Sequence, residues 1–166
     1  MHPSPPASSP TPAALVTVLL AFVEEIGLVV QQEHIEQACF LPGLLLRQGQ
    51  LVVDHHRLLY PGDILHEAGH LAVTAAAERP TVGGNITENH PEKEGEELAV
   101  LAWTYAACRH VGLPAAVVFH PDGYKNQSQW LVEQYETGHY LGLPLLVWMG
   151  LTTTADFPHM HRWLRA

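Results

Sequence analysis

The sequence predicts an α+β fold in which a small antiparallel sheet packs on a helical core. Two apolar segments flank the dipeptide Gln48-Gly49, as the strands of a β-hairpin do. Residues 63–77 and 91–111 carry apolar side chains at helical spacing. The length of 166 residues and the hydrophobic content of 47% suit a single core. We therefore expect a disordered tail at residues 1–11 and one domain at residues 12–166.

The first part of the chain divides into a tail and a helix. Residues 1–11 are rich in proline and serine, which is typical of a disordered segment. From Pro12 to Ile26 the pattern predicts a helix that ends at Gly27. Its apolar run is too short to cross a bilayer, and no Lys or Arg precedes Arg47 to form the basic end of a signal peptide. We expect a cytoplasmic protein without a membrane partner.

Three short extended segments follow this helix. Residues 28–35 begin with apolar, β-branched side chains and predict a strand or an irregular extended segment. Residues 43–47 and 50–54 predict two strands joined by a two-residue turn. The hairpin leads directly into the next helix and is expected to help position it.

Residues 63–77 predict the helix that carries the chemistry. Asp63 can cap its first turn, and Pro80 follows its end. His66 and His70 are four residues apart, so both imidazoles lie on one face and can reach a single ion. The helix therefore offers two ligands to a metal.

The pattern His66-Glu67-x-x-His70 is that of zinc hydrolases. A catalytic Zn²⁺ has three protein ligands and a water whose pKa falls to about 7. Glu67 can take a proton from that water and deliver it to a leaving amine. The alternative is two unrelated histidines in a hydrogen-bonded core. Gly69 predicts that another backbone passes close by, because glycine inside a helix costs about 1 kcal/mol relative to alanine.

The third ligand is expected from the second long helix, residues 91–111, which has an acidic start and an apolar middle. Glu96 is followed by three alanines at helical spacing, a stripe that permits close helix approach, and this narrowly favours Glu96 over Glu97 as the metal ligand. The alternative is a solvated acidic helix start without a ligand. Residues 81–90, rich in glycine and asparagine, predict a mobile loop that can overhang the site.

Together these motifs resemble the ImmA/IrrE-type zinc metallopeptidase family. The matching residues are His66, Glu67 and His70 and, on the following helix, Glu96 with Ala99. The resemblance covers roughly residues 13–114 and departs from the family's second motif at Val100, where an asparagine is usual. It implies a zincin-like fold, Zn²⁺ held by the two histidines and a glutamate, and Glu67 as general base. The domain at residues 12–166 is thus expected to be metallopeptidase-like.

The last third of the chain predicts short elements. These are a short apolar segment, a turn, a helix capped by Ser128, a buried segment and a final short helix, at residues 114–120, 121–123, 129–136, 141–151 and 157–164. Zincins commonly use a tyrosine or histidine to hydrogen-bond the developing oxyanion, and loss of one such donor costs about 3–4 kcal/mol. Tyr124 is the first candidate, followed by His120 and Tyr105, with a core or turn role as the alternative for each.

Composition limits the remaining function classes. Eight Lys and Arg stand against 17 Asp and Glu, giving a net charge of −9 with no basic cluster, so nucleic acid and anionic membranes are not expected as partners. Cys39 and Cys108 belong to no Cys-x-x-Cys unit and are expected to be buried free thiols. His55 and His56 are adjacent, point to different sides, and are expected to lie outside the site.

The sequence thus predicts a zinc-dependent metallopeptidase that hydrolyses an amide bond of a peptide or protein substrate with a metal-activated water. Two alternatives remain open. One is a metal-binding regulatory protein without turnover, and the other is a hydrolase of a non-peptide amide.

Overall fold

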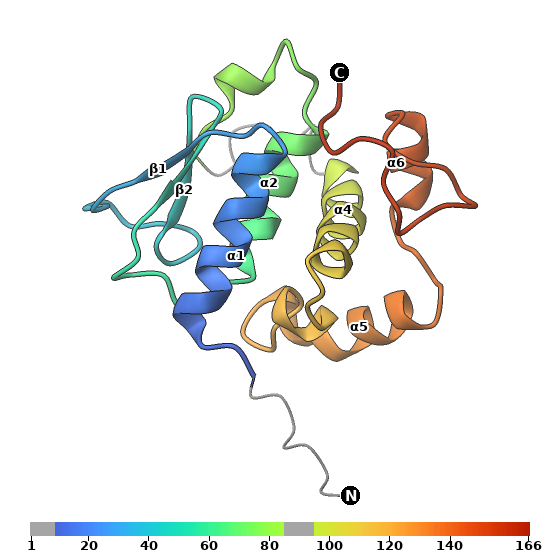
Figure 1. Cartoon of the computed structure of the whole chain (residues 1–166), viewed down its shortest axis with the longest axis horizontal. Helices are drawn as coiled ribbons and strands as arrows, with labels where there is room; N and C mark the ends of the chain where they lie inside the picture. The colour runs from blue at the N-terminus through green and yellow to red at the C-terminus, as the bar shows by residue number, and fades with distance from the viewer. Residues whose placement is uncertain (1–8, 85–94) are drawn as a thin grey trace, which may run out of the picture.

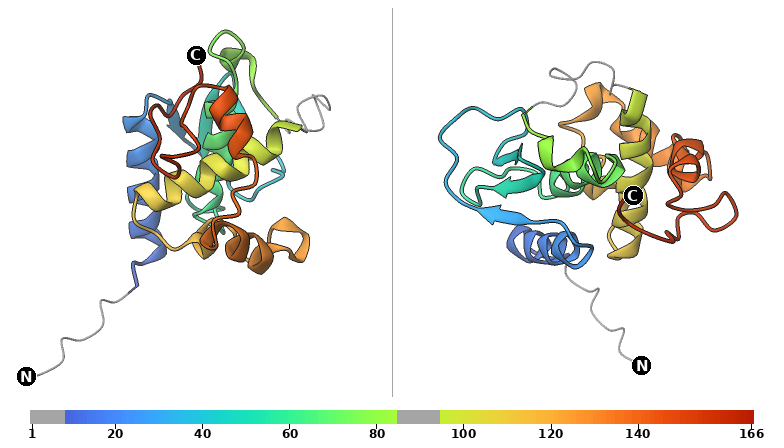
Figure 2. Two further views of the ribbon diagram at one scale, coloured as in Figure 1. Left: turned by 90° about the vertical axis from the view of Figure 1, so that its right-hand side faces the viewer. Right: turned by 90° about the horizontal axis from the view of Figure 1, so that it is seen from above.

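The computed structural model describes residues 9–84 and 95–166. Within these ranges it has five α-helices and one mixed three-stranded sheet, which confirms the α+β class (Figure 1). The sheet, α2, α4 and α6 follow one another across the molecule (Figure 2). Most of the predicted tail and of the predicted loop at 81–90, with the start of the predicted helix at 91–111, lies outside the described residues.

The first helix, α1, spans Pro12–Glu25, close to the predicted bounds. The side chain of Thr11 accepts a hydrogen bond from the Ala14 backbone N–H at 3.2 Å and so caps the first turn. The helix ends before Gly27, whose φ of +104° favours glycine. One face of α1 contributes five side chains to the core: Val16, Leu19, Leu20, Phe22 and Val23.

The predicted hairpin is confirmed as β2 (Leu44–Arg47) and β3 (Gln50–Val53), which pair antiparallel. Gln48 and Gly49 both have positive φ, 50° and 75°, as a tight two-residue hairpin turn requires. The backbone N–H of Gly49 also donates to the Val82 carbonyl at 2.9 Å, so the turn lies against the segment that follows α2. The hairpin is therefore linked to the chain on both sides of that helix.

The prediction of a wholly antiparallel sheet is wrong, because β1 (Val30–Gln32) runs parallel to β3, in the order β1-β3-β2. The physical reason is Asp54, which is buried at the end of β3. Its carboxylate accepts hydrogen bonds from the backbone N–H of Ile35 at 2.9 Å and of His56 at 3.0 Å. These bonds hold the segment after β1 at the same end as β3, so the two strands run in the same direction.

Helix α2 spans Asp63–Val73 and ends short of the predicted residue 77. Arg79 explains the early end, because its guanidinium donates to the carbonyls of Leu71 at 2.8 Å and Thr74 at 3.0 Å. These are carbonyls that a continuing helix would use itself. The predicted capping by Asp63 is also wrong. Gly62 is the N-cap, and Asp63 is the first helical residue without a side-chain capping bond.

Helix α4 spans Glu97–His110 and is buried over most of its length. It packs on α2 at Gly69, where an added Cβ would lie 3.1 Å from Cγ1 of Val100 and 3.2 Å from Cε3 of Trp103. The expected neighbouring backbone at Gly69 is wrong, because side chains of α4 fill the space instead. This contact sets the distance between the two helices that carry the site.

The segment around Arg165 joins α2 and α4. The Arg165 backbone N–H donates to the Ala72 carbonyl at 2.9 Å, and the Trp163 carbonyl accepts from Nε1 of Trp103 at 2.9 Å. The predicted helix at residues 157–164 is wrong, since this segment forms turns and bends. Its backbone N–H groups at residues 161 and 162 donate to the Leu151 carbonyl instead of forming helical bonds.

The remaining helical elements are short: η1 (Arg79–Thr81), η3 (Ala115–Val117), η4 (Tyr124–Asn126), α5 (Ser128–Glu136) and α6 (Leu143–Trp148). Ser128 does not cap α5 as predicted. It is the first helical residue, and its hydroxyl donates to the Phe119 carbonyl. Within the predicted buried segment 141–151, Leu146 and Leu151 are buried, but Trp148 is 72% exposed.

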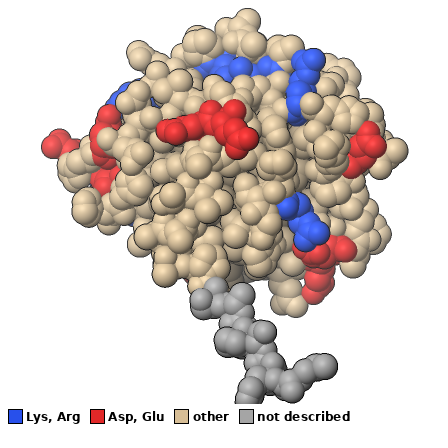
Figure 3. Space-filling model, in the orientation of Figure 1, with Lys and Arg blue, Asp and Glu red and all other residues tan. Residues whose placement is uncertain are grey.

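Three further observations concern the basic residues at the surface, the two cysteines and the lengths of the helices. Figure 3 shows one face, on which Lys and Arg lie in small separate groups. Both cysteines are free, and Cys108 is buried as predicted, whereas Cys39 is only half-buried. In the described part of the chain, none of the helices combines the length and apolarity needed to cross a membrane.

Candidate metal centre

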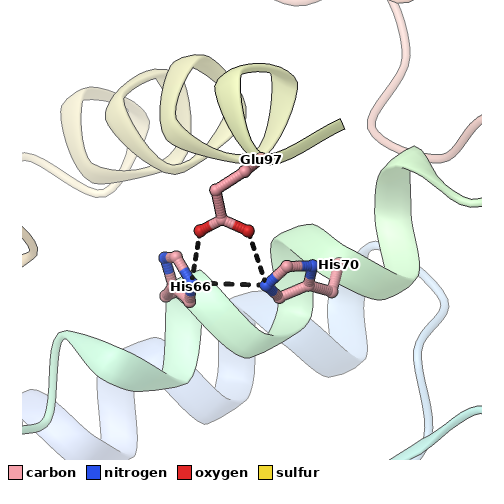
Figure 4. Close-up of side chains that lie close together, drawn as sticks. All are labelled: His66, His70 and Glu97. Atoms are coloured by element: carbon pink, nitrogen blue, oxygen red, sulfur yellow. Dashed lines mark hydrogen bonds and ion pairs between the residues drawn. The ribbon is translucent and has the colours of Figure 1, made fainter. Parts of the chain in front are cut away.

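Three side chains from two helices converge between α2 and α4 (Figure 4). Nε2 of His66 lies 3.3 Å from Nε2 of His70, as expected for residues one helical turn apart. The Glu97 carboxylate reaches across from α4, with Oε1 3.1 Å from Nε2 of His66 and Oε2 3.4 Å from Nε2 of His70. The ligand atoms of the three residues all lie within 4.8 Å of one another. The group could therefore hold one metal ion.

The structure corrects the narrow preference for Glu96. Adjacent residues on a helix point about 100° apart, so only one of the pair can face α2. Glu97 faces the two imidazoles, while Oε1 of Glu96 lies 3.9 Å from the Arg165 guanidinium. The Glu97 side chain shares its face of α4 with Val100 and Thr104, which pack at Gly69.

Burial and charge set the protonation of this group in the protein without metal. Burial lowers the pKa of His70 to about 4, helped by the nearby His66, so His70 is neutral at pH 7. Burial acts to lower the pKa of His66 as well, but the hydrogen bond to Glu97 and the charges of Glu97, Glu67 and Asp63 together outweigh it, and the pKa is raised. Burial acts to raise the pKa of Glu97, but the hydrogen bond to His66 and the charges of His66 and His70 together outweigh it, and the pKa is lowered. An ionised carboxylate and a neutral imidazole are the forms that bind a cation.

Glu67 is the carboxyl group whose pKa bears on proton transfer at this site. Burial raises its pKa to about 7, an effect opposed by His66 and reinforced by the charges of Asp63 and Glu97. Its carboxylate also acts electrostatically on Tyr124. A carboxyl group with this pKa can both accept and return a proton near neutral pH.

Tyr124 is brought to the centre, as predicted. Its hydroxyl lies 3.3 Å from Nδ1 of His66, the ring nitrogen opposite the one that faces Glu97. Burial raises the pKa of Tyr124 far above its ordinary value, so the hydroxyl keeps its proton. Tyr124, Lys125 and Asn126 all have positive φ, between 50° and 67°, an unfavourable backbone conformation that places this side chain.

The two other candidates for the oxyanion donor, His120 and Tyr105, lie in different places. His120 lies beside the centre, where its Nε2 is 2.7 Å from Oδ1 of the buried Asp63 and its ring stacks on Tyr60 at 4.2 Å. Tyr105 is 4% exposed and stacks on Tyr135 at 4.8 Å in the core, so it is not part of the site. Sequence reasoning missed Asp63 as a partner of His120, although its position one turn before His66 places it on the same helical face.

The adjacent histidines stay outside the group, as predicted. Nε2 of His55 lies 2.6 Å from the Gln32 side chain at the sheet, and the backbone of His56 donates to Asp54. His34 pairs with Asp54 at 3.1 Å. These contacts belong to the connection between sheet and α2 and leave His66 and His70 as the histidines of the centre.

A cavity of about 770 Å³ opens beside the centre. His66 and Glu97 form part of its wall, together with Tyr124 and His120. Two of the three candidate ligands, His66 and Glu97, and both candidate hydrogen-bond donors therefore face a space large enough for part of a substrate.

Comparisons of this chain with protein-family models, with curated proteins and with solved structures gave no match. The resemblance to the ImmA/IrrE-type family therefore stays a prediction.

Proposed function

We propose that this protein is a zinc-dependent metallopeptidase with a zincin-like fold, related to the ImmA/IrrE-type family. The observation that carries the proposal is the meeting of His66, His70 and Glu97 beside a cavity, with Glu67 on the same helix. Two imidazoles and one carboxylate are the ligand set of many catalytic zinc sites, in which a fourth position is left for water.

The distances suit this ion. Two nitrogens bound to a tetrahedral zinc at about 2.0–2.1 Å lie roughly 3.3–3.4 Å apart. Nε2 of His66 and Nε2 of His70 are 3.3 Å apart, and the two distances to Glu97 are 3.1 and 3.4 Å. The nitrogen spacing therefore suits zinc, and each imidazole has a different oxygen of the Glu97 carboxylate beside it.

Each residue has a defined task under this proposal. His66, His70 and Glu97 would hold the ion, which when bound polarises a carbonyl and lowers the pKa of a coordinated water to about 7. Glu67 accepts a proton and returns it to the leaving amine, a task that suits its pKa of about 7. Tyr124 donates a hydrogen bond to the oxygen that gains negative charge, because its hydroxyl stays protonated.

The experiment compares the parent with Glu67→Gln, using Glu25→Gln on the exposed face of α1 as the matched control. Metal analysis of the parent should find about one zinc per chain. Cleavage of a mixed peptide library, followed by mass spectrometry, should fall by at least about 100-fold in Glu67→Gln. Both variants should keep the metal, and Glu25→Gln should cleave like the parent.

The same experiment separates the alternatives. A parent protein that binds zinc and cleaves neither peptides nor simple acyl amides would be a regulatory protein. Cleavage of acyl amides alone would identify a non-peptide amide as the substrate. Full activity of Glu67→Gln would show that Glu67 is not the base.

A further inference from the structure

We propose that the cavity beside the metal centre binds a large apolar side chain of a peptide substrate, of the leucine or phenylalanine class, next to the bond that is cleaved. This inference rests on the proposed function and specifies the substrate class. It is drawn from the composition, exposure and charge of the cavity wall.

The wall is apolar over most of its surface, and its apolar residues come from several separate parts of the chain. Phe40 and Leu41 belong to the connection between β1 and β2, Leu98 and Leu101 to α4, and Trp130 and Leu131 to α5. A volume of about 770 Å³ is within the range of small-molecule pockets and exceeds what a single methyl or hydroxymethyl side chain would fill. The complementary ligand is therefore a bulky apolar group.

The exposure of this wall indicates a binding surface. Phe40 is 80% exposed, and Leu98 and Trp130 are each 47% exposed. Scattered exposed apolar residues are ordinary on soluble proteins, but here three large ones from different elements border one cavity. Covering them with a ligand would remove their apolar surface from water, which favours binding.

Charge excludes one class of side chain. Three carboxylates line the cavity, from Asp63, Glu97 and Asp122, and Lys125 is the cation among the described lining residues. Glu97 faces the two imidazoles, Asp63 is paired with His120, and the charges of Asp122 and Lys125 are opposite, so the described wall has no excess of positive charge to attract an acidic group. A glutamate or aspartate at this position of the peptide would be placed against apolar surface without a compensating charge.

The position of the cavity selects a peptide as the occupant. Tyr124 and His66 form part of its wall, so a group bound against Leu98, Leu101 and Trp130 has its adjoining main chain near the centre. An extended peptide has this arrangement, with a side chain and a carbonyl on neighbouring atoms. The pocket would thus bind the apolar side chain of the peptide, and the centre would hydrolyse the peptide bond next to that residue.

The test measures binding without turnover. Zinc-loaded Glu67→Gln is titrated calorimetrically with four peptides that differ only at one central residue, which is Phe, Leu, Ala or Glu. We expect the Phe and Leu peptides to bind at least about tenfold more tightly than the Ala peptide, and the Glu peptide to bind most weakly. Equal affinities, tighter binding of the Glu peptide, or no binding of any peptide would overturn the inference.

Two variants in the same background locate the effect. Trp130→Glu and Phe40→Ala change exposed side chains of the wall and should reduce the preference for Phe over Ala at least about threefold. Trp148→Glu is the matched control, because Trp148 is exposed, does not line the cavity, and would keep an attraction for the Arg165 guanidinium that now lies over its ring. Equal loss in the control would assign the effect to general destabilisation and refute the pocket.

These results are separable from the fate of the proposed function. Selective peptide binding with no cleavage by the zinc-loaded parent would reject the peptidase and support the pocket. Cleavage by the parent with no side-chain preference in binding would support the peptidase and reject the pocket. Binding of N-acyl chains in place of peptides would reject a pocket for a peptide side chain.

Discussion

Replacing Glu97 with glutamine tests the centre most directly, because the change keeps the side chain's size and removes its charge. Glu97 is the carboxylate that faces both imidazoles, at 3.1 and 3.4 Å. Loss of a group that only supports a zinc ligand costs about 10–100-fold in metal affinity, so loss of the ligand itself should cost at least about 100-fold. Glu96→Gln is the matched control, since Glu96 lies toward Arg165 instead.

The expected size of the effect follows from linkage. A 100-fold weaker affinity removes about 2.7 kcal/mol of zinc-dependent stabilisation when the metal is well above its dissociation constant. For a domain of this length, each kcal/mol moves Tm by roughly 2–4 °C, so the zinc-induced rise in Tm should shrink by about 5–11 °C. Calorimetric unfolding with and without zinc, together with competition against a chelator, measures both quantities.

Two outcomes would refute this reasoning. If Glu97→Gln binds zinc as tightly as the parent, the carboxylate is not a ligand. If Glu96→Gln loses the metal instead, the orientation of α4 differs from the one described. A third variant, His70→Gln, should behave like Glu97→Gln, because His70 is neutral at pH 7 and would bind through Nε2.

Three further predictions concern the framework of the centre. Gly69→Val should lower the free energy of unfolding by about 1–3 kcal/mol and weaken zinc binding, because the added carbons would meet Val100 and Trp103 on α4. Gly95→Val is the control and should change neither quantity, because a Cβ at Gly95 meets nothing within 4 Å. Unfolding and zinc titration measure both variants. Arg79→Gln should destabilise by at least about 1.5 kcal/mol, as it removes charged donors from the carbonyls of Leu71 and Thr74, and denaturant unfolding measures the loss. The hydrogen bond from the Ile35 backbone holds the pKa of Asp54 below its ordinary value of 3.8. Asp54 therefore stabilises the protein above that pH and loses this effect as the pH falls through the lowered pKa. The stability difference between the parent and Asp54→Asn, followed by unfolding from pH 6 to 2, should shrink below about pH 4, and a constant difference would contradict the assignment.

The sequence predicted the histidine pair of helix α2 well, because the evidence for it is local. Two histidines at i and i+4 share a face in any α-helix, so His66 and His70 needed no tertiary information to be placed together. The hairpin was predictable for the same reason, since the positive φ values at Gln48 and Gly49 belong to one turn. Both features depend on residues that are neighbours in the chain.

The choice between Glu96 and Glu97 depended on packing, which the sequence states only indirectly. Small residues following Glu96 suggested the closest helix approach, but the small residue at the contact is Gly69 on the opposite helix, and it receives Val100 and Trp103. Gly69 was the better guide to the ligand, because a glycine inside a helix costs stability and so indicates close packing at that point. The face of α4 that packs on Gly69 is the face that carries Glu97.

The parallel strand β1 and the His120–Asp63 pair could not be predicted because long-range contacts create them. Asp54 draws the chain after β1 to the end of β3 through bonds to Ile35, and nothing near either residue encodes that pairing. His120 meets Asp63 because the end of η3 lies against Gly62, the N-cap of α2, a contact between residues far apart in the chain. Predicted element types were more accurate than predicted contacts for this reason.

The bonds made by Trp163 and Arg165 give the candidate centre a dependence on a segment that contributes no ligand to it. The Arg165 backbone donates to Ala72 on α2, and the Trp163 carbonyl accepts from Trp103 on α4, so this segment ties together the two helices that already pack at Gly69. We therefore expect the geometry of His66, His70 and Glu97 to be most tightly fixed when this segment is docked on both helices.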